Sequence, residues 1–181
     1  MAQDKLWFSH SIEGLFARGL GAREKPELEA KLRAAGIDLN KLEPAYPVTK
    51  VIAAARTVLP LVWPQLSEAE QHRQLGVAFM QGYAQTFLGS AMVQVMKLIG
   101  PRRTLERMQK NLRTGGNYIE TRFKAVGATE VELWLSDTSG IPGMYVGIVE
   151  EGGRMVGAKN VRVQLEEEKP PECVLRVTWD P

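Results

Sequence analysis

The sequence predicts an α+β fold in which N-terminal helices pack on a four-stranded antiparallel sheet. Its 181 residues suffice for one domain with its own core, and 44% apolar with 24% charged residues is ordinary for a soluble globular protein. From Gly100 to Trp179 the segments follow the order helix, hairpin, helix, hairpin. We therefore expect a single domain over 1–181, with a helical half at about 1–116 and a sheet-containing half at about 117–181.

Proline and glycine delimit the N-terminal segments. Ile12–Leu20 is short, apolar and edged by glycine, so we expect an edge strand or an extended arm there. Pro26 suits the first residue of a helix, and Gly36 suits the position just after its end. Apolar residues at helical spacing then predict a helix over Val48–Leu59, which Pro60 should end.

The central helices have clear start and stop signals. Ser67 and Glu70 have the spacing of a capping box, which predicts a helix to about Tyr83. A further helix over Phe87–Ile99 should stop at Gly100 and Pro101. The next helical segment, Pro101–Leu112, precedes a glycine pair that should end it.

Residues of alternating polarity predict four strands in two hairpins. In the first strand Ile119 and Phe123 share one face, while Glu120 and Arg122 share the other. The other strands repeat this pattern, so one face of the sheet is apolar and helices must cover it. The predicted strands are Tyr118–Val126, Glu130–Ser136, Val161–Glu166 and Val174–Trp179.

The helix predicted over Pro142–Gly157 contains four glycines, each of which costs a helix about 1 kcal/mol relative to alanine. We interpret them as places where another group approaches the helix backbone closely. That group is the sheet, a neighbouring helix or a ligand.

The sequence offers little chemistry of catalytic type. His10 and His72 are isolated, so we expect no metal site and no cofactor, and Cys173 has no histidine near it in sequence to act as a base. Phosphate-binding loops, serine nucleophile elbows and dinucleotide-binding motifs are absent from the sequence. We therefore do not expect an enzyme.

Composition also bears on location. One cysteine permits no intrachain disulfide, charged residues near the N-terminus argue against a signal peptide, and no apolar run is clean enough to span a membrane. We expect a cytoplasmic protein.

A cluster of cations surrounds the segment that follows Gly100. It could hold a phosphate or an acidic partner protein, or it could be a solvated helix face. Nucleic acid is not expected, because no recognition motif or interleaved aromatic residues accompany the charge. The candidate residues are Arg102, Arg103, Arg107, Lys110 and Arg113, with Lys97 beside them.

Most of the methionines lie on predicted helices around the core. Methionine fills irregular apolar space and adapts to ligands, so core packing and a pocket between helices and sheet are both open. The candidate residues for a small hydrophobic ligand are Met92, Met96, Trp134, Met144, Tyr145 and Gly147.

Four segments resemble a family of uncharacterised domains that is largely restricted to myxobacteria. They are Gly14 to Gly21, Ile99 to Met108, Asn117-Tyr118, and Pro142 to Gly152. More distantly, the second half is similar to the haem-nitric-oxide-binding domain, the four-vinyl-reductase domains and the Golgi-tethering TRAPP subunits. This resemblance implies helices packed on a four-stranded antiparallel sheet, a tendency to dimerise, and binding of small hydrophobic molecules or partner proteins.

The haem-binding residues of that fold are not matched. The Tyr-x-Ser-x-Arg motif of the haem domain corresponds to Trp134–Thr138, where only Ser136 agrees, and the proximal histidine would fall near Leu105. Haem is therefore not expected.

Two functional hypotheses follow. The first is a non-catalytic regulatory or adaptor domain in signalling, which acts through a protein partner or as a dimer and needs a self-complementary apolar patch on its helical layer. The alternative is a sensor that binds a small hydrophobic ligand between helices and sheet.

Overall fold

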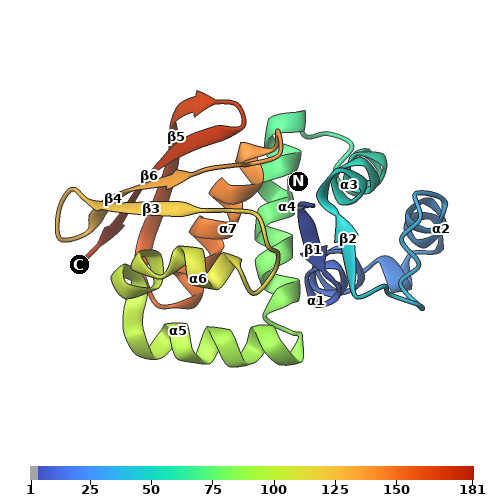
Figure 1. Cartoon of the computed structure of the whole chain (residues 1–181), viewed down its shortest axis with the longest axis horizontal. Coiled ribbons are helices and arrows are strands. Elements are labelled where there is room, and N and C mark those ends of the chain that lie inside the picture. Colours follow the sequence, from blue (N-terminus) through green and yellow to red (C-terminus); the bar gives the residue numbers. More distant parts are fainter. Residues whose placement is uncertain (1–3) are drawn as a thin grey trace.

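The computed structural model describes residues 4–181, and its C-terminal half is built on a four-stranded antiparallel sheet (Figure 1). The strand order is β3-β4-β6-β5, so the first hairpin and the second hairpin meet along β4 and β6. The strands are β3 (Thr121–Ala125), β4 (Glu130–Leu135), β5 (Lys159–Lys169) and β6 (Glu172–Asp180).

One face of this sheet is apolar and buried. Leu133 lies opposite Leu175, and Val131 lies opposite Val177, in the β4–β6 register. These four side chains are almost completely buried, while the alternate residues are half-buried or exposed. The predicted sheet, with helices on one face, is confirmed.

Four helices form the layer on that face and along its edge. They are α4 (Glu68–Tyr83), α5 (Phe87–Glu106), α6 (Met108–Leu112) and α7 (Pro142–Met155). The capping box at the start of α4 is confirmed, because the Ser67 hydroxyl accepts a hydrogen bond from the Glu70 amide. The predicted stop at Gly100 is a sharp kink in α5 with φ of 79°, a left-handed conformation that glycine tolerates. The single helix predicted over Pro101–Leu112 is divided at Arg107.

The glycines of α7 bring its backbone against α4. A Cβ atom at Gly147 would lie 2.0 Å from the carbonyl oxygen of Arg73, and one at Gly76 would lie 1.9 Å from that of Met144. Any side chain at either position would push the helices apart. Of the partners that the sequence left open, a neighbouring helix therefore occupies this part of α7.

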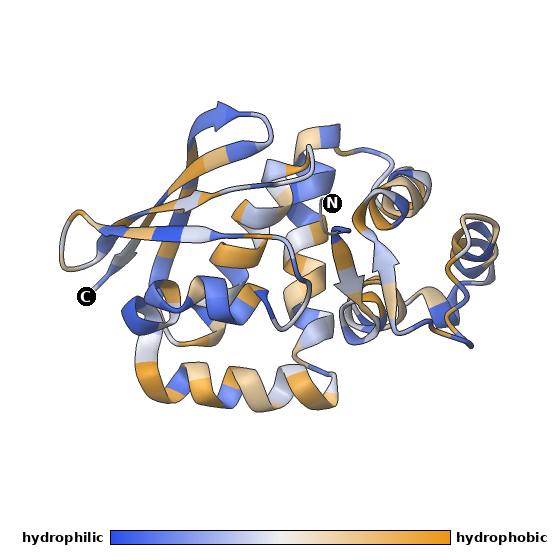
Figure 2. Cartoon of the chain, viewed as in Figure 1, coloured by the Kyte–Doolittle hydropathy of each residue, from blue (hydrophilic) through white to orange (hydrophobic). Residues whose placement is uncertain are grey.

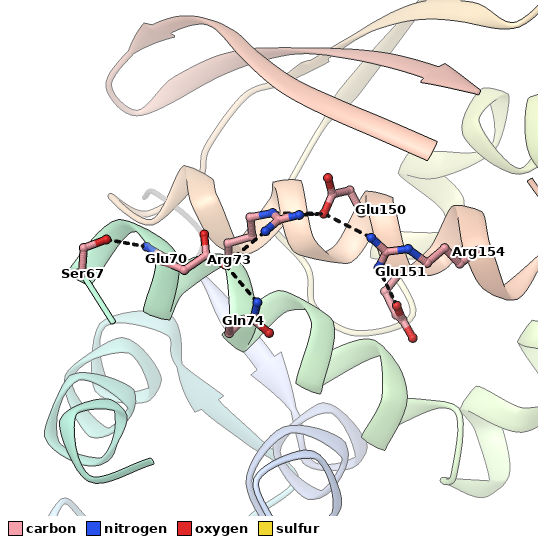
Figure 3. Close-up of polar contacts among 7 residues, drawn as sticks. All are labelled: Ser67, Glu70, Arg73, Gln74, Glu150, Glu151 and Arg154. Atoms are coloured by element: carbon pink, nitrogen blue, oxygen red, sulfur yellow. Dashed lines mark hydrogen bonds and ion pairs between the residues drawn. The ribbon is translucent and has the colours of Figure 1, made fainter. Parts of the chain in front are cut away.

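An ion-pair network ties the same two helices together at their surface (Figure 3). The Arg73 guanidinium donates two hydrogen bonds, of 3.0 and 2.6 Å, to the buried carboxylate of Glu150, and a third to Glu70. On α7, Arg154 pairs with Glu150 at 3.8 Å and with Glu151 at 2.9 Å. The network fixes the rotation of α4 relative to α7.

The N-terminal part of the chain packs on the other side of α4 (Figure 1). A small two-stranded sheet pairs Trp7 with Tyr46, and helices surround it. The elements are β1 (Leu6–Phe8), α1 (Ser9–Ile12), the π-helix η1 (Glu13–Gly19), the 3₁₀ turn η2 (Ala22–Glu24), α2 (Pro26–Ala34), β2 (Ala45–Pro47) and α3 (Val48–Val62).

Two predictions for this part are wrong. Ile12–Leu20 is helical rather than extended, because Ile12, Leu15 and Phe16 share one buried face at helical spacing. Its glycines mark contact with α4, since a Cβ atom at Gly19 would lie 2.3 Å from the Ala78 carbonyl oxygen. Helix α3 also continues past Pro60 to Val62. Its last turn is exposed, so water can hydrogen-bond to the backbone carbonyl that has no N–H partner at Pro60.

In the part of the chain that the structure describes, no helix combines the length and the apolar character needed to cross a membrane.

Candidate ligand cavity

An apolar cavity of about 80 Å³ lies between the end of α4, helices α5 to α7, and strand β6. Phe79, Met80 and Tyr83 of α4 form one wall, and Leu105 and Met108 form another. It is the point at which the helical layer meets the sheet.

Helix α5 supplies the side that faces away from the sheet. Its start is fixed against α4, because Thr86 caps the helix by accepting a hydrogen bond from the Gly89 amide and donates one to the Tyr83 carbonyl. One face of α5 then points inward, with Met92 and Met96 in the cavity wall. In this wall Met96 is buried and Met92 is half-buried.

Gly152, near the end of α7, opens the opposite wall. A Cβ atom at Gly152 would meet only the terminal methyl of Met80, at 3.6 Å, so the absence of a side chain there leaves space. Val177 and Trp179 of β6 complete the lining. Gly152 thus differs from Gly147, which is tightly packed against α4.

The polar groups of the cavity are engaged with one another. The Thr114 hydroxyl lies 3.1 Å from the Tyr83 hydroxyl and donates to the Met92 sulfur at 3.0 Å. The Asn111 amide donates to the Met96 sulfur at 3.7 Å and to the Thr104 carbonyl at 3.2 Å. Burial raises the pKa of Tyr83, so its hydroxyl stays neutral. None of the described residues that line the cavity is charged, and the site suits an uncharged apolar molecule.

A second, smaller cavity of about 30 Å³ adjoins the first across Phe79 and Ile148. A chain of hydrogen bonds borders it, from the indole nitrogen of Trp7 to the Tyr118 hydroxyl at 3.1 Å and on to the Tyr145 hydroxyl at 3.0 Å. Burial is the main cause that raises the pKa of Tyr145 well above its ordinary value.

The structure disperses the six candidate ligand residues. Met92 and Met96 line the larger cavity, and Tyr145 lines the smaller one. Met144 and Gly147 lie where α7 touches α4. Trp134 is on the outer face of the sheet, where Arg122 stacks on its ring at 4.4 Å and its indole donates to a glutamate.

The candidate cations follow the kink in α5. Arg102 is held by the carbonyl oxygens of Gly127 and Ala128, at 2.9 and 3.3 Å, and pairs with Glu106 at 3.4 Å. The remaining candidates are exposed along the end of α5 and along α6, namely Arg103, Arg107, Lys110 and Arg113.

Sequence reasoning did not select several residues of the cavity. Thr104, Asn111 and Thr114 are spaced by seven and three residues, which is the spacing of one helix face, and this signal could have identified them. Met80, Met108 and Trp179 also line the cavity and were not selected.

The histidines lie outside both cavities. His10 is bonded through Nε2 to the Thr114 carbonyl oxygen, and His72 lies on α4, 3.9 Å from Glu68. Among residues 4–181, no cluster of histidine, cysteine, aspartate and glutamate could hold a metal ion.

Comparison with known protein families gives one match. A family model described as "Protein of unknown function (DUF2378)" matches residues 5–180. No curated protein gives a significant match to the sequence. The resemblance to a family of unknown function is thereby confirmed.

Solved H-NOX structures are similar to the whole chain. An H-NOX protein from S. oneidensis gives a TM-score of 0.75 at 9% identity and covers 96% of both chains. An oxygen-binding H-NOX domain related to soluble guanylate cyclases gives 0.68 at 14% identity, also over 96% of both chains. A third, from a study of heme distortion in the H-NOX family, gives 0.68 at 12% identity over 96% of this chain and 95% of that one. At these identities the likeness shows the H-NOX-like α+β fold alone.

Haem does not fit the residues of this cavity. Its 80 Å³ is far below the roughly 300 to 1,000 Å³ of pockets for molecules of cofactor size. Leu105, where the resemblance would place the proximal histidine, is buried in the cavity wall, and no described histidine or cysteine lines it. Asp137 and Thr138, in the segment aligned with the haem motif, are engaged with Lys5 and with the Pro171 carbonyl.

Proposed function

Because the chain belongs to a family described as "Protein of unknown function (DUF2378)", we propose its function from the fold and the cavity. The chain is a sensor domain that binds a small, uncharged, apolar molecule between α5 and the sheet. The observation that carries this proposal is the cavity itself, which has an apolar wall and a few mutually bonded polar groups.

The size of the cavity limits the ligand. An apolar protein cavity of about 150 Å³ holds benzene or xenon, and one water molecule needs about 10–15 Å³. A cavity of about 80 Å³ therefore suits a molecule of a few heavy atoms. The oxygen-binding H-NOX domain named above supports the proposal, because it takes up a small molecule within a similar fold.

Xenon tests the proposal, with the methionine methyl groups as reporters in NMR. We expect xenon under pressure to shift the methyl signals of Met92, Met96 and Met108, which line the cavity. The methyl of Met144 is fully buried elsewhere and serves as an internal control.

Gly152 provides a matched pair of variants. Gly152→Leu should place its side chain in the cavity and abolish the shifts, whereas Gly152→Ala should keep them. Shifts that are absent in the unmodified protein, or equal at all methionines, would refute the proposal. A native mass spectrum of the purified protein, compared with its denatured mass, then identifies any ligand retained from the cell.

An adaptor function is the second candidate, because an apolar patch is exposed on the helical layer. Phe87, Leu88, Val95 and Leu98 of α5 are all exposed. Loss of self-association in a Leu98→Ser variant, measured by analytical ultracentrifugation, would support this candidate.

A further inference from the structure

Helix α5 has two apolar faces, of which only one is covered. Its inner face carries Met92, Val93 and Met96, which are half-buried or buried. Successive residues of a helix are rotated by about 100°, so a second set of apolar residues falls on the opposite side. This outer stripe consists of Phe87, Leu88, Ala91, Val95 and Leu98.

The outer stripe is unusually exposed for apolar side chains. Phe87 and Leu98 are 94% and 87% exposed, and they lie at opposite ends of a segment about 16 Å long. Only Ser90, Gln94 and Lys97 are polar between Phe87 and Ile99, and Figure 2 shows this helix at the edge of the molecule. A helix that is apolar nearly all round is normally buried on all sides. The exposed outer stripe therefore has the character of an interaction surface.

Positive charge is concentrated in the chain segment that contains and follows this stripe. Between Phe87 and Gly116 lie six of the 23 lysines and arginines but only one of the 21 carboxylates, so the remainder of the chain has a net charge of −3. The hydrogen bonds of Asn111 and Thr114 to the sulfur atoms of α5 place the cationic segment alongside that helix. These bonds reach Met92 and Met96 on the inner face of α5, so the cationic segment flanks the helix on that side, while Lys97 is an exposed cation of α5 itself.

We propose that the outer stripe of α5, together with Lys97, Arg103, Arg107, Lys110 and Arg113, docks on an anionic phospholipid surface. An apolar helix face beside clustered cations is the combination that binds the membrane interface, since apolar side chains enter the acyl boundary and cations attract the headgroups. The apolar part of the helix is too short to cross the bilayer, so the helix would lie along the membrane surface.

A second copy of the chain fits this surface less well. Two copies joined along α5 would bring two clusters of like charge together. The stripe also offers only five apolar residues, against about 20–30 residues a side in a stable interface. A lipid surface needs no such shape-matched area and neutralises the cations, and it accepts a convex helix that forms no groove.

Cosedimentation with vesicles tests the proposal. The protein should bind vesicles of phosphatidylserine and phosphatidylcholine and dissociate from them as the salt concentration rises. It should not bind vesicles of phosphatidylcholine alone. Phe87→Ser with Leu98→Ser should lower the partition coefficient at least tenfold. Lys110→Glu with Arg113→Glu should lower it by about 30-fold or more, because each cation near the surface contributes about fivefold.

Matched controls exist on the N-terminal part of the chain. Leu61→Ser replaces an exposed apolar residue on α3, and Lys31→Glu with Lys41→Glu makes the same change in net charge at exposed positions far from α5 in sequence. These variants should bind as the unmodified protein does.

Three results would overturn the proposal. One is an unmodified protein that stays in the supernatant with both kinds of vesicle. Another is equal loss of binding in the control variants. The third is a dimer that the stripe variants convert to monomer without any vesicle binding, which would assign the stripe to a second copy.

Discussion

Replacing Gly147 by alanine should destabilise the protein, although alanine is the better helix former. In an exposed helix this substitution gains about 1 kcal/mol. Here the new methyl carbon would lie 2.0 Å from the Arg73 carbonyl oxygen and 2.9 Å from the Val77 amide nitrogen. Both atoms belong to the backbone of α4 and cannot rotate away, so the helices must separate.

The expected magnitude follows from these two opposing effects. Overpacking of a rigid core costs typically about 1–3 kcal/mol, and separation of two helices at their closest point belongs at the upper end. After subtraction of the propensity gain we expect a net loss of about 2 kcal/mol. For a chain of this length that corresponds to a fall of roughly 4–8 °C in Tm.

Gly152→Ala is the matched control on the same helix. Its methyl group would meet only the flexible end of Met80, at an ordinary contact distance of 3.6 Å. This variant should therefore be neutral or more stable by up to about 1 kcal/mol. Urea or thermal unfolding of both variants, followed by circular dichroism, measures the difference in sign. Equal stabilities for the two variants would show that α4 and α7 do not touch at Gly147.

Three further predictions concern buried polar groups. Arg73→Met should cost roughly 2 kcal/mol in unfolding free energy, because it leaves the buried Glu150 carboxylate without its main partner, and Glu150→Gln in the same chain should recover part of that loss. Burial raises the pKa of Cys173 to about 12, so stability should fall as pH rises from 9 toward 12, where only the unfolded thiol ionises, and Cys173→Ala should flatten this part of the profile. Burial also lowers the pKa of His72, although the charge of Glu68 opposes this shift. The stability of the protein should therefore fall as pH drops below 6.5, and the fall should be smaller in His72→Gln.

The sheet half of the fold was predictable because its signals are local. Alternation assigns the apolar face of each strand, and Gly100 ends a helix by its own conformation. The same alternation places Trp134 with Glu132 on the polar face, so its selection as a residue of a pocket under the sheet was an avoidable error.

The errors arise where tertiary contact gives a residue its role. The glycines of Ile12–Leu20 suggested extended chain, but they are there because α4 approaches the π-helix at Gly14 and Gly19. A sequence shows that a glycine is present and does not show which backbone lies against it. For the same reason Gly147 and Gly152 look alike in the sequence. Gly147 allows α4 and α7 to pack closely, whereas Gly152 leaves space in the cavity wall.

The position of Trp179 gives the protein an optical property. This indole is largely buried in the wall of the larger cavity, whereas Trp63 and Trp134 are half-buried away from it and Trp7 lines the smaller cavity. Tryptophan emission depends on the polarity and the quenching groups around the ring, and methionine sulfur atoms lie in the same wall. Entry of a molecule should therefore change the intrinsic fluorescence of Trp179, so that binding can be followed by titration without any label.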